Sequence, residues 1–439
     1  MPNFTIFWIV TYVGGIVLSF VNPLFGLLTY LFEYYLRPKL HWWGDSELPD
    51  WRWNLIVGTV VTVTFLIRRG SLPSIPKLNN PALRWFVALA LSMVVVTTWA
   101  VDYDKSWEET TAFLKLVLLY GLIVGIIRTK GMFDAFMAVH VAGAGWWGWT
   151  AYIDPKRISG RLQNVGSSDT LNDNTAAAHL LTVLPILCVY ALTSKDKRLR
   201  ILALVTAPFI VNTFILCNSR GATVGLVAGL VAAIILARPG HRMRMLGAGA
   251  AIGVLFFALA DQTFVDRQKT INDEDAGAER IETWQGARRL LQDHPLGVGG
   301  GGFEYLSPIY IPEVIAAHDG ERRSVHNTWL LLATEWGIQG FVLFVFFIGS
   351  TIVLCHKVRR LARGDTDFFY RSLAIQVGLI STLTAATFSN RFLGESIYWM
   401  CGLAFALYRV SAKEFAAEAV APASEPAHAT FRPAATAAS

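Results

Sequence analysis

The chain has 439 residues, of which 54% are hydrophobic and only 16% are charged, and its mean hydropathy is +0.43. Soluble domains carry about 25% charged residues, so this composition excludes an ordinary soluble protein and predicts an integral membrane protein. The net charge of +6 is expected when Lys and Arg are retained on the cytoplasmic side of a membrane, so it does not indicate a nucleic-acid partner.

Apolar stretches follow one another along most of the chain. The first, Phe4–Leu36, is interrupted at Asn22-Pro23 and is expected to be one kinked element or a tight pair of helices. Counted once, it opens a series of about twelve predicted transmembrane helices, and the fold class is therefore all-α and polytopic. The other stretches are Leu55–Ile67, Ala82–Ala100, Thr110–Ile127, Met132–Ile153, Thr175–Thr193, Ile201–Leu216, Ala222–Ala237, Leu246–Ala260, Thr328–Cys355, Leu373–Phe388 and Ile397–Val410.

Positive charge occupies alternate connections between these stretches, as at Arg68-Arg69, at Arg128 with Lys130, and along Lys195–Arg200. Because Lys and Arg stay on the cytoplasmic face, these connections are predicted to be cytoplasmic and the others to face outward. The outward set includes residues 261–325, which hold seven Lys and Arg against twelve Asp and Glu and so have a net charge of −5.

This outward connection is about 65 residues long, and connections of that length are usually functional or disordered. It divides the chain into transmembrane helices with short loops over 1–260, a long periplasmic loop carrying short helices over 261–325, and further transmembrane helices over 326–410. Residues 411–439 are rich in Ala and Pro and are expected to form a disordered cytoplasmic tail.

A histidine stands where the long loop meets the next apolar stretch. His326 and Asn327 directly precede the stretch that begins at Thr328. A neutral imidazole accepts a proton near neutral pH, so His326 is a candidate general base that would activate a sugar hydroxyl. An interfacial histidine that only caps the helix is the alternative interpretation.

Two arginines occur in outward connections before the long loop. Arg220 follows Asn218-Ser219 at the outward end of two consecutive apolar stretches, where an arginine is expected to face a cavity or a partner. Its planar guanidinium suits phosphate oxygens, although a side chain that merely extends to the interface gives the same pattern. Arg161 lies in a polar connection that suits phosphate or sugar hydroxyls, although taken alone this composition favours a solvated loop.

The long loop holds a second group of candidates. Arg280, Trp284 and Arg288 are spaced i, i+4 and i+8, so a helix over 278–292 would place all three on one face. Such a face could hold phosphate and stack on a sugar ring, or it could be a solvated face. The run Gly297–Gly302 lacks the flanking features of a nucleotide loop, which favours backbone approach to a ligand or a tight turn before Phe303. Without the spacing of a zinc or calcium motif, the predicted site is metal-independent and uses no cofactor.

Several short motifs surround the long loop in a fixed order. They are Asn218-Ser-Arg220-Gly-Ala222, Arg280-x-x-x-Trp284, Asp293-His-Pro295-Leu-Gly-Val-Gly299, His326-Asn-Thr-Trp-Leu330 and Glu335-Trp-Gly-Ile-Gln-Gly340. Over roughly residues 160–400 this pattern resembles the O-antigen ligase (WaaL-type) and O-antigen polymerase superfamily of bacterial inner-membrane glycosyltransferases.

The resemblance implies transfer of a glycan from undecaprenyl diphosphate to an acceptor on the periplasmic face, which in ligases is a sugar of the lipid A-core. It implies that His326 is the catalytic base and that Arg220 contacts the diphosphate. Further implied diphosphate contacts are Arg280, Arg288 and Arg161, and the implied supporting residues are Asn327, Trp284 and Glu335. The implied reaction is a direct displacement that inverts the anomeric carbon.

Other functions share this pattern. An O-antigen polymerase uses the same donor with a second lipid-linked glycan as acceptor, and a protein O-oligosaccharyltransferase uses Ser or Thr of a secreted protein. A flippase for lipid-linked glycans also needs cations in a membrane cavity, but it predicts arginines spread through the transmembrane helices. Here the arginines gather at outward ends, which favours an enzyme.

Overall fold

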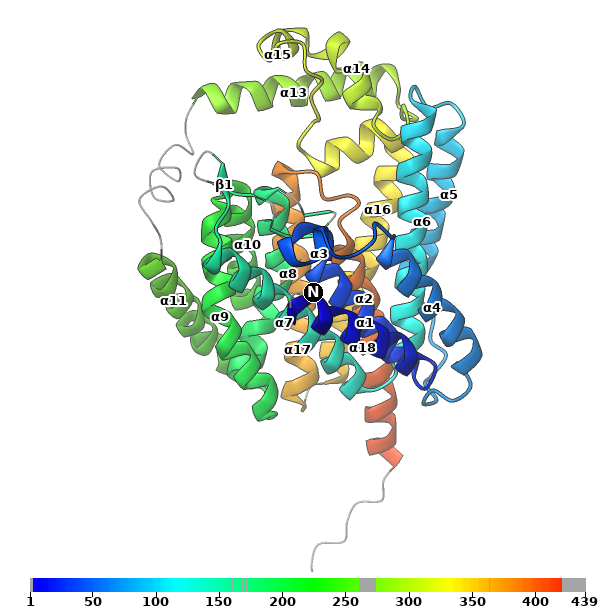
Figure 1. Cartoon of the computed structure of the whole chain (residues 1–439), viewed down its shortest axis with the longest axis vertical. Coiled ribbons are helices and arrows are strands. Elements are labelled where there is room, and N and C mark those ends of the chain that lie inside the picture. The colour runs from blue at the N-terminus through cyan, green and yellow to red at the C-terminus, as the bar shows by residue number, and fades with distance from the viewer. Residues whose placement is uncertain are drawn as a thin grey trace, which may run out of the picture.

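The computed structural model describes residues 3–158, 161–163, 165–167, 169–170, 172–259, 274–362 and 364–420. Within these ranges the chain forms a bundle of long helices, with further helices lying across one end of it (Figure 1). The helices of the bundle are α1 (Asn3–Ser19), α2 (Pro23–Leu36), α4 (Trp53–Arg68), α5 (Pro81–Thr97), α6 (Tyr103–Ile126), α7 (Lys130–Ile153), α8 (Asp173–Thr193), α9 (Lys197–Cys217), α10 (Arg220–Leu236), α11 (Arg242–Leu259), α16 (Thr328–Leu361), α17 (Thr366–Ala385) and α18 (Glu395–Val420).

Short elements connect these helices. The helices outside the bundle are α3 (Trp42–Asp45), α13 (Glu274–Asp293), α14 (Gly302–Tyr310) and α15 (Pro312–Ala316), and the 3-10 turns are η1 (Pro38–Leu40), η2 (Pro239–His241) and η4 (Ala386–Phe388). Strand β1 (Arg157–Ile158) pairs antiparallel with β2 (Arg161–Leu162).

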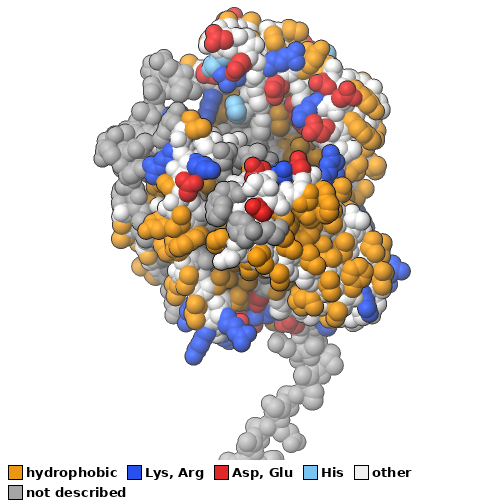
Figure 2. Space-filling model, in the orientation of Figure 1, with side chains coloured by type: hydrophobic (Ala, Val, Ile, Leu, Met, Phe, Trp, Pro, Cys, Tyr) orange, Lys and Arg blue, Asp and Glu red, His pale blue; other side chains and the backbone are white. Residues whose placement is uncertain are grey.

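Four helices, α6, α8, α9 and α16, are long and apolar enough to cross a membrane by length and composition, and α1, α4, α5 and α10 are shorter apolar helices. Figure 2 shows a broad band of hydrophobic side chains around the middle of the molecule, with charged side chains concentrated above and below it. These features are those of a helical membrane protein, as the composition predicts. The count of about twelve spans stays a prediction.

The first apolar stretch is a tight pair of helices. Asn22 caps α2, since its side chain accepts a hydrogen bond from the backbone N–H of Leu24, and Pro23 occupies the first helical position. A Cβ built on Gly26 would lie 2.9 Å from the Cβ of Ser19, so α1 and α2 pack closely beside the turn. Of the two expected arrangements, the pair is the one observed.

The basic connections meet at the end of the bundle opposite α13. There Arg128 donates from Nη1 to the carbonyl of Pro73 at 3.3 Å, and Arg238 donates from Nη2 to the carbonyl of Ala362 at 2.6 Å. Arg371 pairs with Asp134, with 2.7 Å between Nε and Oδ1. Connections that the sequence assigns to the same side are therefore neighbours in these two contacts, and the side of the membrane that they face stays a prediction.

Helix α18 runs ten residues beyond the boundary expected at 411. Residues 411–420 are rich in Ala, Glu and Lys, which are good helix formers, and Phe415 packs against Phe368 with 5.5 Å between ring centroids. The rest of the expected tail, 421–439, lies outside the described residues, as does the start of the long loop, 261–273.

Helix α16 is broken at Gly337, whose φ of 75° and ψ of 174° are not helical. The break removes the regular partners of the carbonyls of Thr334 and Glu335. The backbone N–H groups of Val298 and Gly299 donate to these two carbonyls at 3.1 and 2.8 Å. The extended segment after α13 thus replaces a missing helical turn and fastens the outer helices to α16.

This contact leaves no room for a side chain at position 297. A Cβ on Gly297, where φ is 89°, would lie 2.5 Å from the carbonyl oxygen of Glu335 and 2.5 Å from the backbone nitrogen of Gly337. On the far side of the break, the N–H of Ile338 donates to the carbonyl of Pro295 at 3.0 Å. Of the two expectations for the glycine run, the tight turn before Phe303 is present, since the N–H of Gly302 donates to the carbonyl of Gly299 at 3.0 Å, whereas the close approach is to the backbone of α16.

Candidate functional site

Two adjoining cavities open at the end of the bundle that carries α13, and Figure 2 shows a hollow beneath the outer helices. The first, which we call the tryptophan cavity, has a volume of about 260 Å³ and is lined by Arg220, Gly221, Val224, Gly277, Arg280, Ile281, Trp284 and Phe388. The second, the histidine cavity, has a volume of about 220 Å³ and is lined by Arg220, Glu279, Arg280, Thr283, Arg323, Ser324, Val325 and His326. Both contain Arg220 and Arg280, so these two residues stand between a largely apolar chamber and a polar one.

A two-residue turn places Arg220 at the first position of α10. Asn218 ends α9 in the left-handed conformation with φ of 50°, and the side chain of Ser219 caps α10 by accepting a hydrogen bond from the N–H of Ala222 at 3.3 Å. The first turn of a helix carries free N–H groups and the positive end of its dipole. Since Arg220 and Gly221 line the cavity there, this corner favours an anion.

Helix α13 presents Arg280 and Trp284 to the tryptophan cavity, where the Trp284 ring lies 6.4 Å from that of Phe388 between centroids. Arg288 is exposed and is not among the residues that line either cavity. Eight residues of an α-helix rotate a side chain about 80° past two full turns, which turns Arg288 away from Arg280. The expected shared face holds for Arg280 and Trp284 and was wrong for Arg288.

His326 immediately precedes the cap of α16 and lines the histidine cavity. Its φ of 48° is left-handed, a conformation that costs energy for a residue with a side chain and that occurs often at functional sites. Asn327 caps α16, because its Oδ1 accepts hydrogen bonds from the N–H groups of Trp329 at 3.0 Å and Leu330 at 3.2 Å. The amide of Asn327 therefore positions His326 and the helix start together.

Arg161 approaches the same region from the loop between α7 and α8. It forms an ion pair with Asp173, and its Nη2 donates to Oδ1 of Asn174 at 3.0 Å. The same Oδ1 accepts a hydrogen bond from the hydroxyl of Ser219 at 2.7 Å, which ties this loop to the residue before Arg220. Arg161 is thus a neighbour of the two cavities and is not among their lining residues.

One lining arginine was absent from the site predicted from sequence. Of the adjacent pair before His326, Arg323 lines the histidine cavity, while Arg322 places its guanidinium over the ring of Tyr305 at 4.6 Å. The backbone N–H of Arg323 donates to the hydroxyl of Ser307 at 3.3 Å, which holds the segment against α14. Its position three residues before His326 is the feature of the sequence that could have indicated that Arg323 lines the cavity.

Burial and two neighbouring arginines favour the neutral form of the His326 imidazole. Partial desolvation, together with the positive charges of Arg280 and Arg323, lowers the pKa of His326, while Glu279 acts in the opposite direction. Burial, with the charges of Arg220 and Arg161, lowers the pKa of Arg280 itself. His326 is therefore neutral at pH 7, and an anion bound among the arginines would relieve their mutual repulsion.

Glu335 lies away from both cavities. It is buried in α16 about two turns beyond His326. Its carboxylate accepts hydrogen bonds from the backbone N–H groups of Gly301 and Phe303. It therefore contacts the segment that joins α13 to α14, and a supporting role in the site stays a prediction. Across the described ranges, no three His, Cys, Asp or Glu side chains gather as a metal site requires; metal independence stays a prediction.

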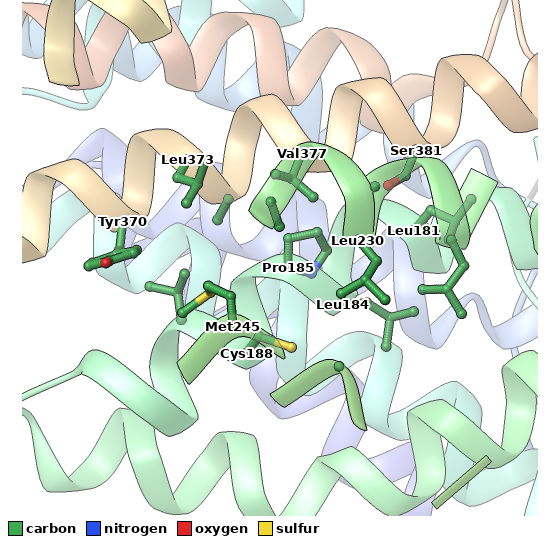
Figure 3. A pocket seen from close by; sticks show the side chains of 16 residues that line it. Leu181, Leu184, Pro185, Cys188, Leu230, Met245, Tyr370, Leu373, Val377 and Ser381 are labelled. Carbon is green, nitrogen blue, oxygen red and sulfur yellow. The ribbon is translucent and has the colours of Figure 1, made fainter. Parts of the chain in front are cut away.

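A third cavity, of about 90 Å³, lies inside the bundle between α8, α10, α11 and α17 (Figure 3). We call it the intramembrane cavity, and its lining includes Leu181, Leu184, Pro185, Cys188, Leu230, Ala233, Met245, Leu373 and Val377. Along α10, Val224 lines the tryptophan cavity and Leu226 lines the intramembrane cavity from another side of the helix, because two residues rotate a side chain by about 200°. The two cavities are therefore separate chambers beside the same helix.

A buried ion pair supports the mouth of the site. Arg391 is 1% exposed, and its Nη1 donates to the carbonyl of Asp169 at 2.6 Å, while Nη2 lies 3.5 Å from the Oδ2 of the same residue. Asp169 also accepts a hydrogen bond from the hydroxyl of Tyr34 at 2.6 Å, and the N–H of Arg391 donates to the hydroxyl of Thr328 at 2.8 Å. The loop that carries Arg161 is thereby tied to the start of α16. The sequence around Arg391 and Asp169 contains no local motif that predicts this pair.

The fold and the two cavities define a helical membrane protein with clustered arginines and a histidine at one mouth. Residues 202–345 match the family model described as O-antigen ligase. The match includes Arg220, Arg280 and His326 and supports the O-antigen ligase and polymerase superfamily that the sequence motifs indicate, a family of glycosyltransferase-type enzymes of glycan assembly. No curated protein matches the chain.

Proposed function

We propose that the protein is an O-antigen ligase that transfers a glycan from undecaprenyl diphosphate to a sugar of the lipid A-core, on the periplasmic face of the bacterial inner membrane. One observation carries the proposal. Arg220 and Arg280 lie between an apolar chamber and the chamber that contains His326. This order matches the order of chemical groups in the donor, which are a polyprenyl chain, a diphosphate and a sugar.

The apolar end of the donor has apolar side chains to pack against. The wall formed by Val224, Ile281, Trp284 and Phe388 adjoins the arginines, and the intramembrane cavity is a separate apolar chamber further along α10 (Figure 3). A polyprenyl chain placed there would lie in apolar surroundings, with its diphosphate at the helix start that bears Arg220. The glycan would then extend into the histidine cavity.

In the proposed reaction, the acceptor hydroxyl oxygen attacks the anomeric carbon of the donor while its proton passes to the neutral imidazole of His326. The bond from the anomeric carbon to the diphosphate oxygen breaks, and undecaprenyl diphosphate leaves with both electrons of that bond. Arg220 and Arg280 stabilise the negative charge that develops on the leaving group, an effect that supplies about 3 kcal/mol for one well-placed donor. A single displacement of this kind inverts the anomeric configuration.

The test is a transfer assay with purified protein, the lipid-linked glycan and lipid A-core. His326→Ala and Arg280→Ala are expected to lower the rate by about a hundredfold or more. His294→Ala and Arg288→Ala are matched controls, because both side chains are exposed and outside the two cavities, and they should retain at least roughly a third of the activity. Full activity of His326→Ala would refute the mechanism.

The same assay distinguishes the other candidates by product. Transfer of glycan to lipid A-core indicates a ligase, lengthening of the lipid-linked glycan indicates a polymerase, and transfer to Ser or Thr of an added polypeptide indicates a protein O-oligosaccharyltransferase. Movement of the donor across vesicles without any transfer, unaffected by His326→Ala, would indicate a flippase.

A further inference from the structure

A fourth cavity, which we call the aromatic cavity, opens at the same end of the molecule and has a volume of about 160 Å³. It lies between the start of α1, the segment from η1 to α3, the last turns of α7 and the strand segment that follows. Four aromatic side chains line it: Phe4, Trp43, Trp146 and Trp149. Neither the family match, which begins at residue 202, nor the mechanism above uses any of them.

The rings form flat apolar surfaces. The imidazole of His41 stacks on Trp43 with 5.4 Å between centroids and 8° between planes, and Trp146 lies edge-on to His41 at 6.0 Å. Phe4 lies 5.7 Å from Trp146. Trp43 is buried, whereas Trp149 is 43% exposed and so offers its ring to anything that enters.

The polar groups of this cavity are balanced in charge. Asp154, Lys156 and Gln163 lie among the lining residues, which supply one negative, one positive and one neutral group. Burial and the nearby Lys156 lower the pKa of His41 to about 4, so its imidazole is neutral and both donates and accepts hydrogen bonds. These groups therefore give the aromatic cavity no preference for an anion, in contrast with the arginine cluster.

Aromatic faces with neutral donors and acceptors match the chemistry of a sugar. A pyranose ring presents C–H groups on its faces and hydroxyl groups at its edge, so it stacks on aromatic rings while its hydroxyls bind polar side chains. A membrane lipid headgroup would bring a phosphate, for which this charge balance provides no attraction.

The aromatic cavity is joined to the arginine cluster by one short segment. Arg161 in β2 contacts Asp173 and Asn174 beside Arg220, and Gln163, two residues later, lines the aromatic cavity. The N–H of Gln163 donates to the carbonyl of Lys156 at 2.8 Å, which fixes this segment. Two residues of extended chain span about 7 Å, so the aromatic cavity lies close to the residues that hold Arg161.

We propose that the aromatic cavity is a carbohydrate subsite that holds a sugar unit of one of the two glycans at a distance from the reacting carbon. This inference rests on the proposed function and adds a specificity determinant to it. The sugar belongs to the donor glycan or to the lipid A-core acceptor, and the two sources share the same recognition chemistry.

Kinetics of transfer test the subsite. Trp149→Ala should raise the KM of one substrate about tenfold, the loss of one ring stack of about 1.4 kcal/mol, and leave kcat within roughly twofold. Trp149→Phe keeps a ring and should restore most of the affinity. Trp107→Ala is the matched control, because Trp107 is 44% exposed and lies on α6 outside the cavity. The substrate whose KM rises identifies the source of the sugar.

The proposal is overturned if neither KM moves, or if Trp107→Ala has the same effect as Trp149→Ala. A direct measurement separates it from the proposed function. Saturation-transfer NMR uses the free oligosaccharides released by mild acid from the donor lipid and from lipid A-core. One of the two should bind to wild type and to His326→Ala and should not bind to Trp149→Ala. If neither oligosaccharide binds to wild type, or if vesicles of phosphatidylethanolamine and phosphatidylglycerol abolish the binding, the aromatic rings serve the membrane interface and the subsite is refuted. Retained transfer by His326→Ala would instead refute the mechanism.

Discussion

Gly297 lies in the segment that replaces a turn of α16, and we expect one added methyl group there to lower the stability of the protein strongly. In Gly297→Ala the added carbon would lie 2.5 Å from backbone atoms of Glu335 and Gly337, and neither backbone atom can rotate away. Relief requires the segment to separate from α16, which breaks the hydrogen bonds made by Val298, Gly299 and Ile338. Three backbone hydrogen bonds at about 1 kcal/mol each, with about 1 kcal/mol for a left-handed φ, give a loss of about 4 kcal/mol.

This loss is measured as a lower midpoint of thermal unfolding in detergent at one fixed heating rate. Gly349→Ala, in α16, is the control, because nothing lies within 4 Å of the carbon that it adds. Its unfolding midpoint should equal that of wild type. Transfer should fall as well in Gly297→Ala, since the segment anchors α13 and hence Arg280. A midpoint and a transfer rate both equal to wild type would refute the argument that this segment holds the site together.

Three further predictions follow from the site. Arg323→Gln removes a charge that lowers the pKa of His326, so the acidic limb of kcat/KM against pH should move to higher pH; an unmoved limb contradicts this. Asp169→Asn leaves the buried guanidinium of Arg391 without its carboxylate and should lower the free energy of unfolding by about 3 kcal/mol, measured by denaturant titration, whereas an unchanged value contradicts the pairing. Ala233→Trp fills the intramembrane cavity and should raise the KM of a long-chain polyprenyl donor about tenfold with little effect on a short-chain analogue; equal effects contradict the placement of the chain.

Composition and short motifs were enough to predict the helical membrane architecture and the superfamily. The apolar stretches correspond to helices, and the run around Arg280 and Trp284 forms the helix that its spacing indicates. Arg220 and His326, far apart in sequence, line one cavity because the motifs that contain them start two helices at the same end of the bundle.

Rotation and packing were not readable from local spacing. Arg288 fits an i+8 pattern, yet the accumulated rotation of α13 turns it outward, and Arg323 enters the cavity because its segment is bonded to Ser307. Glu335 belongs to one of the sequence motifs, and in the structure it contacts the segment that packs at the break in α16. The break itself is visible only in the path of the backbone. The pairing of Arg391 with Asp169 joins residues more than two hundred positions apart, a relation that periodicity does not encode.

The central claim is that the arginines of the two cavities hold a lipid diphosphate beside His326. An experimental structure of the protein with bound polyprenyl diphosphate tests it most directly. The account predicts the diphosphate within hydrogen-bond distance of Arg220 and Arg280, with the prenyl chain along α10 and the free phosphate end toward His326. A diphosphate bound at the opposite end of the bundle, or one that contacts neither arginine, would contradict it.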